Sequence, residues 1–284
     1  MSRRLRVGLA LTYRGRPGEA ADVVADFSHA GAQLVCVSEV WGFDAVSLLG
    51  YLAARAPGVE LASNTLPLYT RTPALLAMTA AGLDALTGSR FTLGLGASGP
   101  QVVEGFHGVA HDAPVARTRE VVEICRSVWR GDAVEHQGRH YSVPLAQERG
   151  GSGLGTPLRL LNRPPRTRVP VMLAALGPRN TALAAEVAEE WAPFMFRPES
   201  AVEVWGDALA SGLALRDPAL GRLGITVPAR VAVGGDVQTG LAEHRSILAL
   251  YLGGMVVRTR NFYADLARRY GFAAEVDAVQ EHFL

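Results

Sequence analysis

Short apolar runs alternate with segments of helical periodicity along nearly the whole chain, and this alternation constrains the fold more than any other feature. The apolar runs predict seven strands, at 5–11, 33–39, 59–66, 91–95, 169–176, 191–196 and 225–233. Helices are predicted between them at 19–30, 44–55, 73–86, 117–129, 177–190 and 199–213, with two or three more over 238–284. Such alternation requires a parallel sheet with right-handed crossovers. The count is one strand short of the eight that close a (β/α)8 barrel.

Local signals mark where several of these helices begin and end. Gly31 follows the first helix as a C-cap residue would, Asp44 suits the N-cap of the second, and Pro73 suits the first turn of the third. Residues 131–168 are rich in Gly, Pro and Arg and have little periodicity. We expect this irregular insertion to act as a lid that supplies pocket side chains. No second hydrophobic core is evident, so a single domain over 1–284 is expected.

The fourth predicted strand runs into a glycine-rich turn. Gly94, Gly96 and Gly99 lack side chains, so backbone N–H groups there can approach a ligand closely, and Glu104 and His107 follow within two helical turns. Similar glycine spacing binds dinucleotides, but there it follows the first strand and an acid ends the next one. Three strand–helix units precede it here, which argues against a dinucleotide fold. A tight barrel turn that binds nothing is the other alternative.

The composition excludes several enzyme classes. All 28 basic residues are arginine, so Schiff-base aldolases, pyridoxal-phosphate enzymes and P-loop nucleotide hydrolases, which need a lysine, are excluded. The formal net charge of +1 gives no electrostatic reason to expect nucleic acid or an acidic membrane as a partner.

Cysteine usage and the N-terminus bear on the compartment. Cys36 and Cys125 both lie in apolar patterns and are expected to be inert core thiols, and no metal site is expected. The N-terminal apolar run ends too early for a signal peptide, and no segment is apolar for long enough to span a bilayer. We therefore expect a cytoplasmic protein.

Three segments, in this order, resemble a known family: 38–46 (SEVWGFDAV), 64–108, and 170–191 (PVMLAALGPRNTALAAEVAEEW). They are similar to the bacterial luciferase-like oxidoreductases, and among these to the branch that uses the deazaflavin coenzyme F420. The resemblance implies an α/β fold, a TIM-barrel-like (β/α)8 structure that here lacks the final strand–helix unit. It also implies that the cofactor, F420 or alternatively FMN, lies at the carboxyl ends of the strands.

The resemblance further implies the residues that bind the cofactor. It places a non-proline cis peptide at Asn64–Thr65 beneath the cofactor ring. It also matches 176–180 to a phosphate loop before a helix, where unpaired N–H groups and Arg179 would hold an anion; an ordinary capped helix without a ligand is the alternative. The implied set is Asn64, Thr65, Leu66, Gly96, Ser98, Gly99, Ala174, Ala175, Leu176, Gly177, Pro178, Arg179 and Asn180.

The resemblance is less direct for the catalytic groups. Glu39 falls where relatives carry an acid near the ring, but the next position, a histidine in many of them, is Val40 here. Glu104 and His107 lie near the fourth-strand loop and could replace that histidine, although both residue types also serve as structural hydrogen-bonding groups. Two aromatic residues are expected to line the substrate pocket, Tyr13 and Trp41.

The resemblance implies a reductase that transfers hydride between F420 and a small organic substrate, with a C=C or C=N bond of a biosynthetic intermediate as the target. One alternative is a monooxygenase that uses reduced FMN. An alternative of another class is a non-catalytic flavin-binding or scaffold protein. Because an unclosed barrel leaves two strand edges free, we expect either a homodimer whose helices shield the gap or a terminal helix folded across it.

Overall fold

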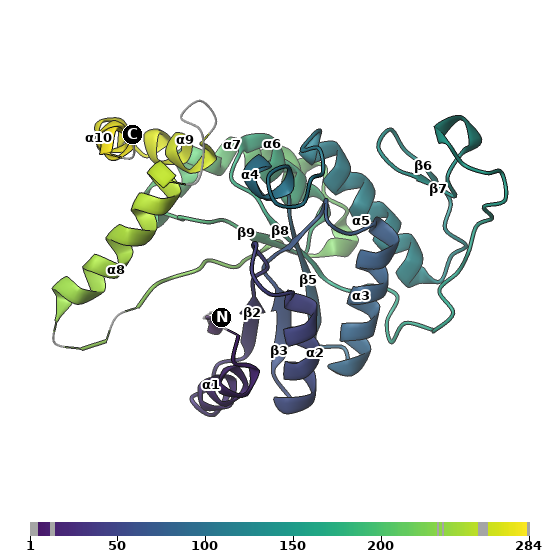
Figure 1. The fold of residues 1–284 in the computed structure, drawn as a ribbon, viewed down its shortest axis with the longest axis horizontal. Helices are drawn as coiled ribbons and strands as arrows, with labels where there is room; N and C mark the ends of the chain where they lie inside the picture. Colours follow the sequence, from purple (N-terminus) through teal and green to yellow (C-terminus); the bar gives the residue numbers. More distant parts are fainter. Residues whose placement is uncertain (1–4, 12–14, 232, 235, 255–260, 283–284) are drawn as a thin grey trace.

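A curled parallel sheet organises the fold (Figure 1). The computed structural model describes residues 5–11, 15–231, 233–234, 236–254 and 261–282. The strands follow one another in the order β1-β2-β3-β5-β8-β9-β10, and the short β4 also pairs with β5. Their bounds are Gly8–Leu11 (β1), Leu34–Val37 (β2), Glu60–Ser63 (β3), Leu66–Pro67 (β4), Phe91–Gly96 (β5), Val171–Ala174 (β8), Glu190–Ala192 (β9) and Gly224–Ile225 (β10). All seven predicted strands are therefore present, in the predicted order.

Two of the predicted strands are much shorter than expected. The run 191–196 pairs only as far as Ala192, and 225–233 only as far as Ile225. Pro193 and Pro228 follow these ends, and a proline has no N–H to donate to a strand ladder. The predictions extended both strands too far because they followed hydrophobicity and gave these prolines too little weight.

The two faces of the sheet pack differently. Alternate residues of the strands form a small cluster on the concave face, namely Leu34, Cys36, Ala62, Met172 and Ala192. The other face packs under the helices into the main core. Arg6, which precedes β1, lies 3.5 Å from Glu190 of β9, so the curl brings the first strand back toward the sixth. Within the described residues β1 and β10 do not pair, and the sheet stays open as a half-barrel.

Helices pack on the convex face of the sheet. Several of them begin and end at the residues that the sequence indicates. Asp44 caps α2 by accepting from the N–H of Ser47 at 2.7 Å, and Pro73 begins α3. Gly31 takes φ +99° just after the first helix, as its C-cap role requires. The helices are α1 (Pro17–His29), α2 (Ala45–Arg55), α3 (Pro73–Leu86), α4 (Pro100–Val103), α5 (Pro114–Arg130), α6 (Pro178–Val187), α7 (Ala201–Ala214), α8 (Val237–Ala249), α9 (Phe262–Arg269) and α10 (Ala273–His282). A π-helical turn, Leu250–Gly254, joins the end of α8.

The insertion at 131–168 does not form the predicted lid. It contains a hairpin of β6 (His136–Gln137) and β7 (Ser142–Val143), and none of its residues lines the cavity described below. The carboxylate of Glu120 on α5 accepts from the backbone N–H groups of His140 and Tyr141. These contacts hold the insertion against α5, away from the carboxyl ends of the strands.

Both cysteines are buried free thiols, as predicted. Burial raises the pKa of Cys36 and of Cys125 to about 12. Such thiols stay protonated and unreactive. No helix in the described part of the chain is long and apolar enough to cross a membrane.

Candidate functional site

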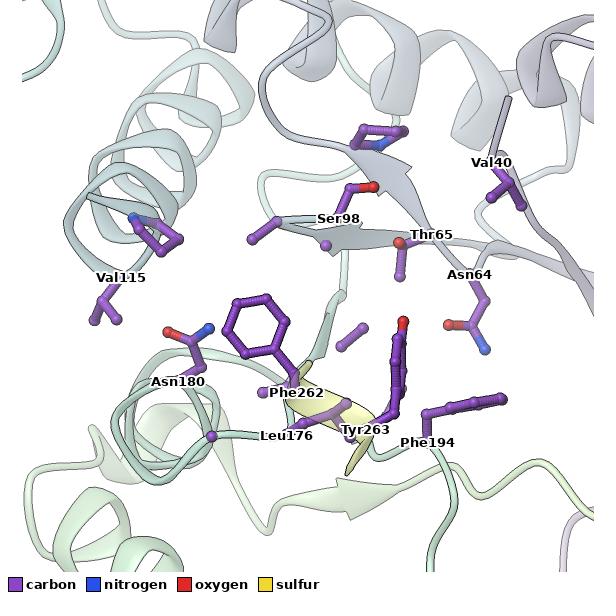
Figure 2. Close-up of a pocket in the computed structure, with 18 of the residues that line it drawn as sticks. Val40, Asn64, Thr65, Ser98, Val115, Leu176, Asn180, Phe194, Phe262 and Tyr263 are labelled. Carbon is purple, nitrogen blue, oxygen red and sulfur yellow. The ribbon is translucent and has the colours of Figure 1, made fainter. Parts of the chain in front are cut away.

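A cavity of about 510 Å³ opens at the carboxyl ends of the strands. Segments that follow β2, β3, β5, β8 and β9 form it, and the π turn and α9 complete it from the C-terminal part of the chain (Figure 2). Most of the predicted cofactor residues line it: Asn64, Thr65, Gly96, Ser98, Ala174, Ala175, Leu176, Gly177, Pro178, Arg179 and Asn180. Leu66 and Gly99 do not. Leu66 is fully buried and pairs with Leu95, and Gly99 is the N-cap of the short α4.

Glycines of β5 allow the end of β3 to lie against it. A Cβ on Gly94 would meet the carbonyl oxygen of Ser63 at 1.7 Å, and one on Gly96 would meet Thr65 Oγ1 at 2.5 Å. The Ser63 hydroxyl donates to the Gly94 carbonyl and accepts from its N–H. The peptide Asn64–Thr65 that follows is cis, as the resemblance implies. Gly94 and Gly96 therefore admit a neighbouring strand, whereas the sequence had suggested that their openness serves a ligand.

The start of α6, with the loop before it, lines one end of the cavity. Gly177 is its N-cap, Pro178 follows, and no side chain caps the helix, so N–H groups of the first turn stay open. Arg179 is exposed at the rim, and within the described residues it has no recorded ion pair or side-chain hydrogen bond. Asn180 Oδ1 is buried without a hydrogen-bond partner among the described residues. Open N–H groups at a helix start and a nearby cation suit an anionic group such as a phosphate, and the Asn180 oxygen, which is an acceptor, suits a hydroxyl donor beside it.

Two tryptophans hold this loop from behind. The Trp191 indole N–H donates to the Ala175 carbonyl at 3.0 Å, and that of Trp205 donates to the Leu176 carbonyl at 3.0 Å. The two rings pack edge to face with centroids 5.2 Å apart, and both are fully buried. The path of the loop is therefore fixed by the core beneath it.

Glu39 lines the cavity, but its carboxylate has partners. Arg71 donates two hydrogen bonds to it, at 2.5 Å and 2.9 Å, and the N–H of Ala45 donates a third at 2.9 Å. The two side chains are only 10% and 14% exposed. Because three donors already point at its oxygens, this carboxylate is fixed in place and orients the wall of the cavity.

The other predicted catalytic residues lie in the loop after α4, outside the cavity lining. Glu104 accepts from the backbone N–H of His111 at 3.0 Å. His111 does line the cavity, and its Nε2 is buried without a partner among the described residues. The same holds for His107 Nε2, although His107 is not in the lining. The structure thus adds His111 to the candidates, and its proximity to the glycine turn was the signal in the sequence that could have found it.

Within the described residues the cavity is lined by aromatic side chains other than the predicted Trp41. Trp41 is 48% exposed and does not line the cavity, and Tyr13 lies outside the described residues. The aromatic side chains that do line the cavity are Phe194, Tyr251, Phe262 and Tyr263. The sequence prediction missed all four, because Phe194 belonged to an expected strand and the others to unplaced C-terminal helices.

The luciferase-like monooxygenase family model matches residues 4–284. The chain therefore belongs to this family, and it is an oxidoreductase of the luciferase-like type. It is 40% identical over 284 residues to a Mycobacterium tuberculosis protein provisionally named as a coenzyme F420-dependent oxidoreductase, and the match covers 98% of this chain and 81% of that protein.

Solved structures share the fold. The F420-dependent tetrahydromethanopterin reductase of Methanopyrus kandleri superposes with a TM-score of 0.77 at 18% identity, over 96% of this chain and 77% of that one. The oxygenating constituent of 3,6-diketocamphane monooxygenase from Pseudomonas putida, solved with FMN, gives a TM-score of 0.67 at 15% identity, over 96% and 79%. The TIM-barrel-like prediction is confirmed at the level of fold.

Proposed function

We propose that the chain is an F420-dependent oxidoreductase that transfers hydride between the coenzyme and a small organic substrate. The observation that carries the proposal is the cavity itself. Asn64 and Thr65 line it together with the uncapped start of α6, which follows β8. The relative at 40% identity supports F420 as the cofactor. The bound deazaflavin would supply the hydride at its C5 atom.

The residues present suit such a cofactor. The open N–H groups of α6 and the Arg179 guanidinium would hold its phosphate, and the unsatisfied Asn180 amide oxygen, which is an acceptor, would accept a hydrogen bond from a hydroxyl group of the cofactor. Gly177, Pro178 and Arg179 are all exposed, so a chain that continues beyond the phosphate can run out into solvent. This suits the long tail of F420. The phosphate of FMN would end there, so the same loop also suits FMN, the cofactor of the alternative monooxygenase.

We propose that the reduced group is a C=C or C=N bond of a biosynthetic intermediate. Reduction also needs a proton, and Glu39, Glu104 and His107 remain its predicted donors. The ion pair with Arg71 argues against Glu39, whereas the unpartnered Nε2 that His111 presents in the cavity lining makes it a further candidate.

The test is a fluorescence titration of the purified protein with F420 and, in parallel, with FMN. We expect selective binding of F420, and a loss of about tenfold in affinity in Arg179→Ala, since a charged hydrogen bond contributes about 1.5–3 kcal/mol. Arg222→Ala, at an exposed arginine before β10, is the control and should bind normally. Selective FMN binding would favour the monooxygenase. Binding without turnover across a substrate panel would favour the non-catalytic alternative.

We also propose that the chain is a single domain and forms a homodimer. Within the described residues the outer edges of β1 and β10 pair with no other strand, which supports the dimer because unpaired strand edges in native proteins are usually covered. Light scattering coupled to size exclusion measures the mass directly. A monomer at micromolar concentration would contradict the proposal and leave the edges to be covered within one chain.

A further inference from the structure

Three aromatic rings from separate elements pack together and form one wall of the cavity. Phe194 follows β9, Tyr251 lies in the π turn, and Tyr263 belongs to α9. The ring centroids of Phe194 and Tyr251 are 4.7 Å apart, those of Tyr251 and Tyr263 are 4.7 Å apart, and those of Phe194 and Tyr263 are 5.7 Å apart. These are the separations of tilted and edge-to-face pairs, so each ring fixes the others.

The wall is held in place by Asn261. Its amide donates to the carbonyls of Tyr251 and Leu252, and its Oδ1 accepts from the N–H groups of Tyr263 and Ala264. One buried side chain therefore joins the π turn to the start of α9. A rigid aromatic wall loses little conformational entropy when it binds a ligand.

The charged residues of the cavity lining belong to other elements than the aromatic wall. Arg179 lies in the α6 loop, and Glu39, after the end of β2, is ion-paired with Arg71. The three rings themselves carry no charge. A cation, Arg230, acts on Tyr251 and opposes the effect of burial on its pKa, but it is exposed and lies outside the cavity lining. Because solvent screens an exposed charge, a charged ligand buried against the rings would gain little compensation, which favours an uncharged ligand.

The wall carries two hydroxyl groups, those of Tyr251 and Tyr263, and the hydroxyl of Tyr263 is directed across the cavity. Figure 2 shows the ring standing in the cavity with its oxygen directed toward Thr65. No described residue makes a recorded hydrogen bond to that oxygen. Burial, and secondarily the nearby Tyr251, raises the pKa of Tyr263 to about 12, so the hydroxyl keeps its proton and can donate it in a hydrogen bond.

We propose that Phe194, Tyr251 and Tyr263 form the substrate subsite. This subsite binds a flat, uncharged, unsaturated molecule. The Tyr263 hydroxyl donates a hydrogen bond to a carbonyl or imine acceptor of that molecule. This inference extends the proposed function, and it rests on that function only where it calls the bound molecule a substrate. The subsite itself is present in the chain without any cofactor. A hydrogen bond to such an acceptor withdraws electrons from the conjugated bond, which is what hydride addition requires.

The test is a set of binding titrations by calorimetry on the purified full chain, alone and with F420. The probes are coumarin, which is flat, neutral and carries a carbonyl; coumarin-3-carboxylate, its anionic counterpart; and 1,2-dihydronaphthalene, which has the same outline and no acceptor. We expect coumarin to bind at least tenfold more tightly than its carboxylate. Phe194→Ala should weaken coumarin about tenfold, because a lost aromatic contact costs about 1.4 kcal/mol.

The hydroxyl is tested separately by Tyr263→Phe. This variant keeps the ring, so dihydronaphthalene should bind within about twofold of normal, while coumarin should lose about three- to tenfold. Phe27→Leu, an exposed position on α1, is the control and should change nothing. Equal losses for the two neutral probes in Tyr263→Phe would overturn the role of the hydroxyl.

The titrations distinguish failure of the proposed cofactor from failure of the proposed substrate subsite. If Phe194→Ala lowers F420 affinity and leaves coumarin binding unchanged, the rings stack on the cofactor and the inference is wrong. If F420 fails to bind but the probe differences persist, the subsite stands and the proposed cofactor falls. If the anionic probe binds as tightly as the neutral one, the assignment of an uncharged ligand is overturned.

Discussion

Gly94 decides how closely β3 and β5 can approach. Gly94→Ala would place a methyl group 1.7 Å from the Ser63 carbonyl oxygen, so a strand must move. We expect a loss of at least 3 kcal/mol in the free energy of unfolding, or no folded protein. Gly82→Ala is the control: the position lies within α3 and nothing lies within 4 Å of its added Cβ. That variant should gain about 0.5–1 kcal/mol. Urea unfolding measures both, and a normal stability for Gly94→Ala would contradict the observed strand contact.

The ion pair between Glu39 and Arg71 is a second contact between single residues that should affect stability. Arg71→Met removes one partner of a nearly buried pair and leaves the carboxylate uncompensated. We expect a loss of about 3 kcal/mol in the free energy of unfolding. Arg16→Met breaks an exposed pair with Glu19, in which the side chains are 76% and 65% exposed, and should cost less than about 1 kcal/mol. Equal effects in chemical denaturation would show that the pair at Glu39 is not a buried one.

Individual site residues could be predicted only in part. The sequence motifs predicted that Asn64, Thr65 and the residues around Asn180 belong to one site, and all of them line one cavity, because backbone motifs follow local sequence. The partner of Glu39 could not be predicted, since Arg71 lies 32 positions away and only the fold brings them together. The aromatic wall depends on the same kind of long-range contact.

At the scale of elements, Asn261 joins α9 to the π turn. Asn261→Ala removes four hydrogen bonds and leaves buried backbone groups unsatisfied. We expect a loss of about 2–3 kcal/mol in the free energy of unfolding. The control is Thr72→Ala, which removes an ordinary N-cap bond to Leu75 and should cost about 1 kcal/mol. Thermal unfolding of both variants checks this, and similar losses would mean that Asn261 acts as a simple cap.

The insertion is attached to α5 by a carboxylate whose contribution depends on pH. Burial of Glu120 would raise its pKa, but the N–H groups of Tyr141 and His140 and the ring of His136 outweigh it and lower the pKa. A lowered pKa in the folded state means that the stability is present above the ordinary glutamate value of about 4.3 and is lost as the pH falls through the folded value. The stability difference between wild type and Glu120→Gln should therefore be constant from pH 7 to 6 and shrink below about pH 4.5. Urea unfolding across this range measures it; a difference that grows on acidification would reverse the sign.

Element boundaries were predicted well where a cap or proline marks them and poorly where hydrophobicity alone was used. Asp44 and Pro73 lie where the sequence placed them. The strands ending at Ala192 and Ile225 were overextended, and 131–168 was assigned as a lid because it lacks periodicity. Loop composition indicates irregular backbone, but the anchoring of such a loop depends on buried partners such as Glu120.

At the scale of the whole molecule, the alternation of strand and helix predicted a parallel α/β sheet in the right order. The count of seven strands also predicted that the sheet stays open, as it does within the described residues. Its curl was beyond the alternation and came only from the family resemblance, because curl depends on packing on the concave face. Small residues such as Ala62 and Ala192 on that face allow the curl.

Local stability should be uneven across the molecule. None of the described side chains of α8 is buried, whereas α5 buries seven residues. We expect amide hydrogen exchange to be fastest in α8 and slowest in β5 and β8. Mass spectrometry of exchanged peptides measures this. Slow exchange in α8 would mean that another surface covers it, and in the proposed dimer its protection should rise with protein concentration.

The two tryptophans behind the α6 loop give the molecule an optical reporter of its own. Of four tryptophans in the chain, Trp129, Trp191 and Trp205 are at most 1% exposed, and only Trp41 is open to solvent. Iodide in solution should quench the emission of Trp41 alone and leave a blue-shifted component from the buried indoles. Because Trp191 and Trp205 donate to the loop carbonyls, that component should change when an anion occupies the loop. Occupancy of the phosphate end could then be followed without a label, separately from binding at the aromatic wall.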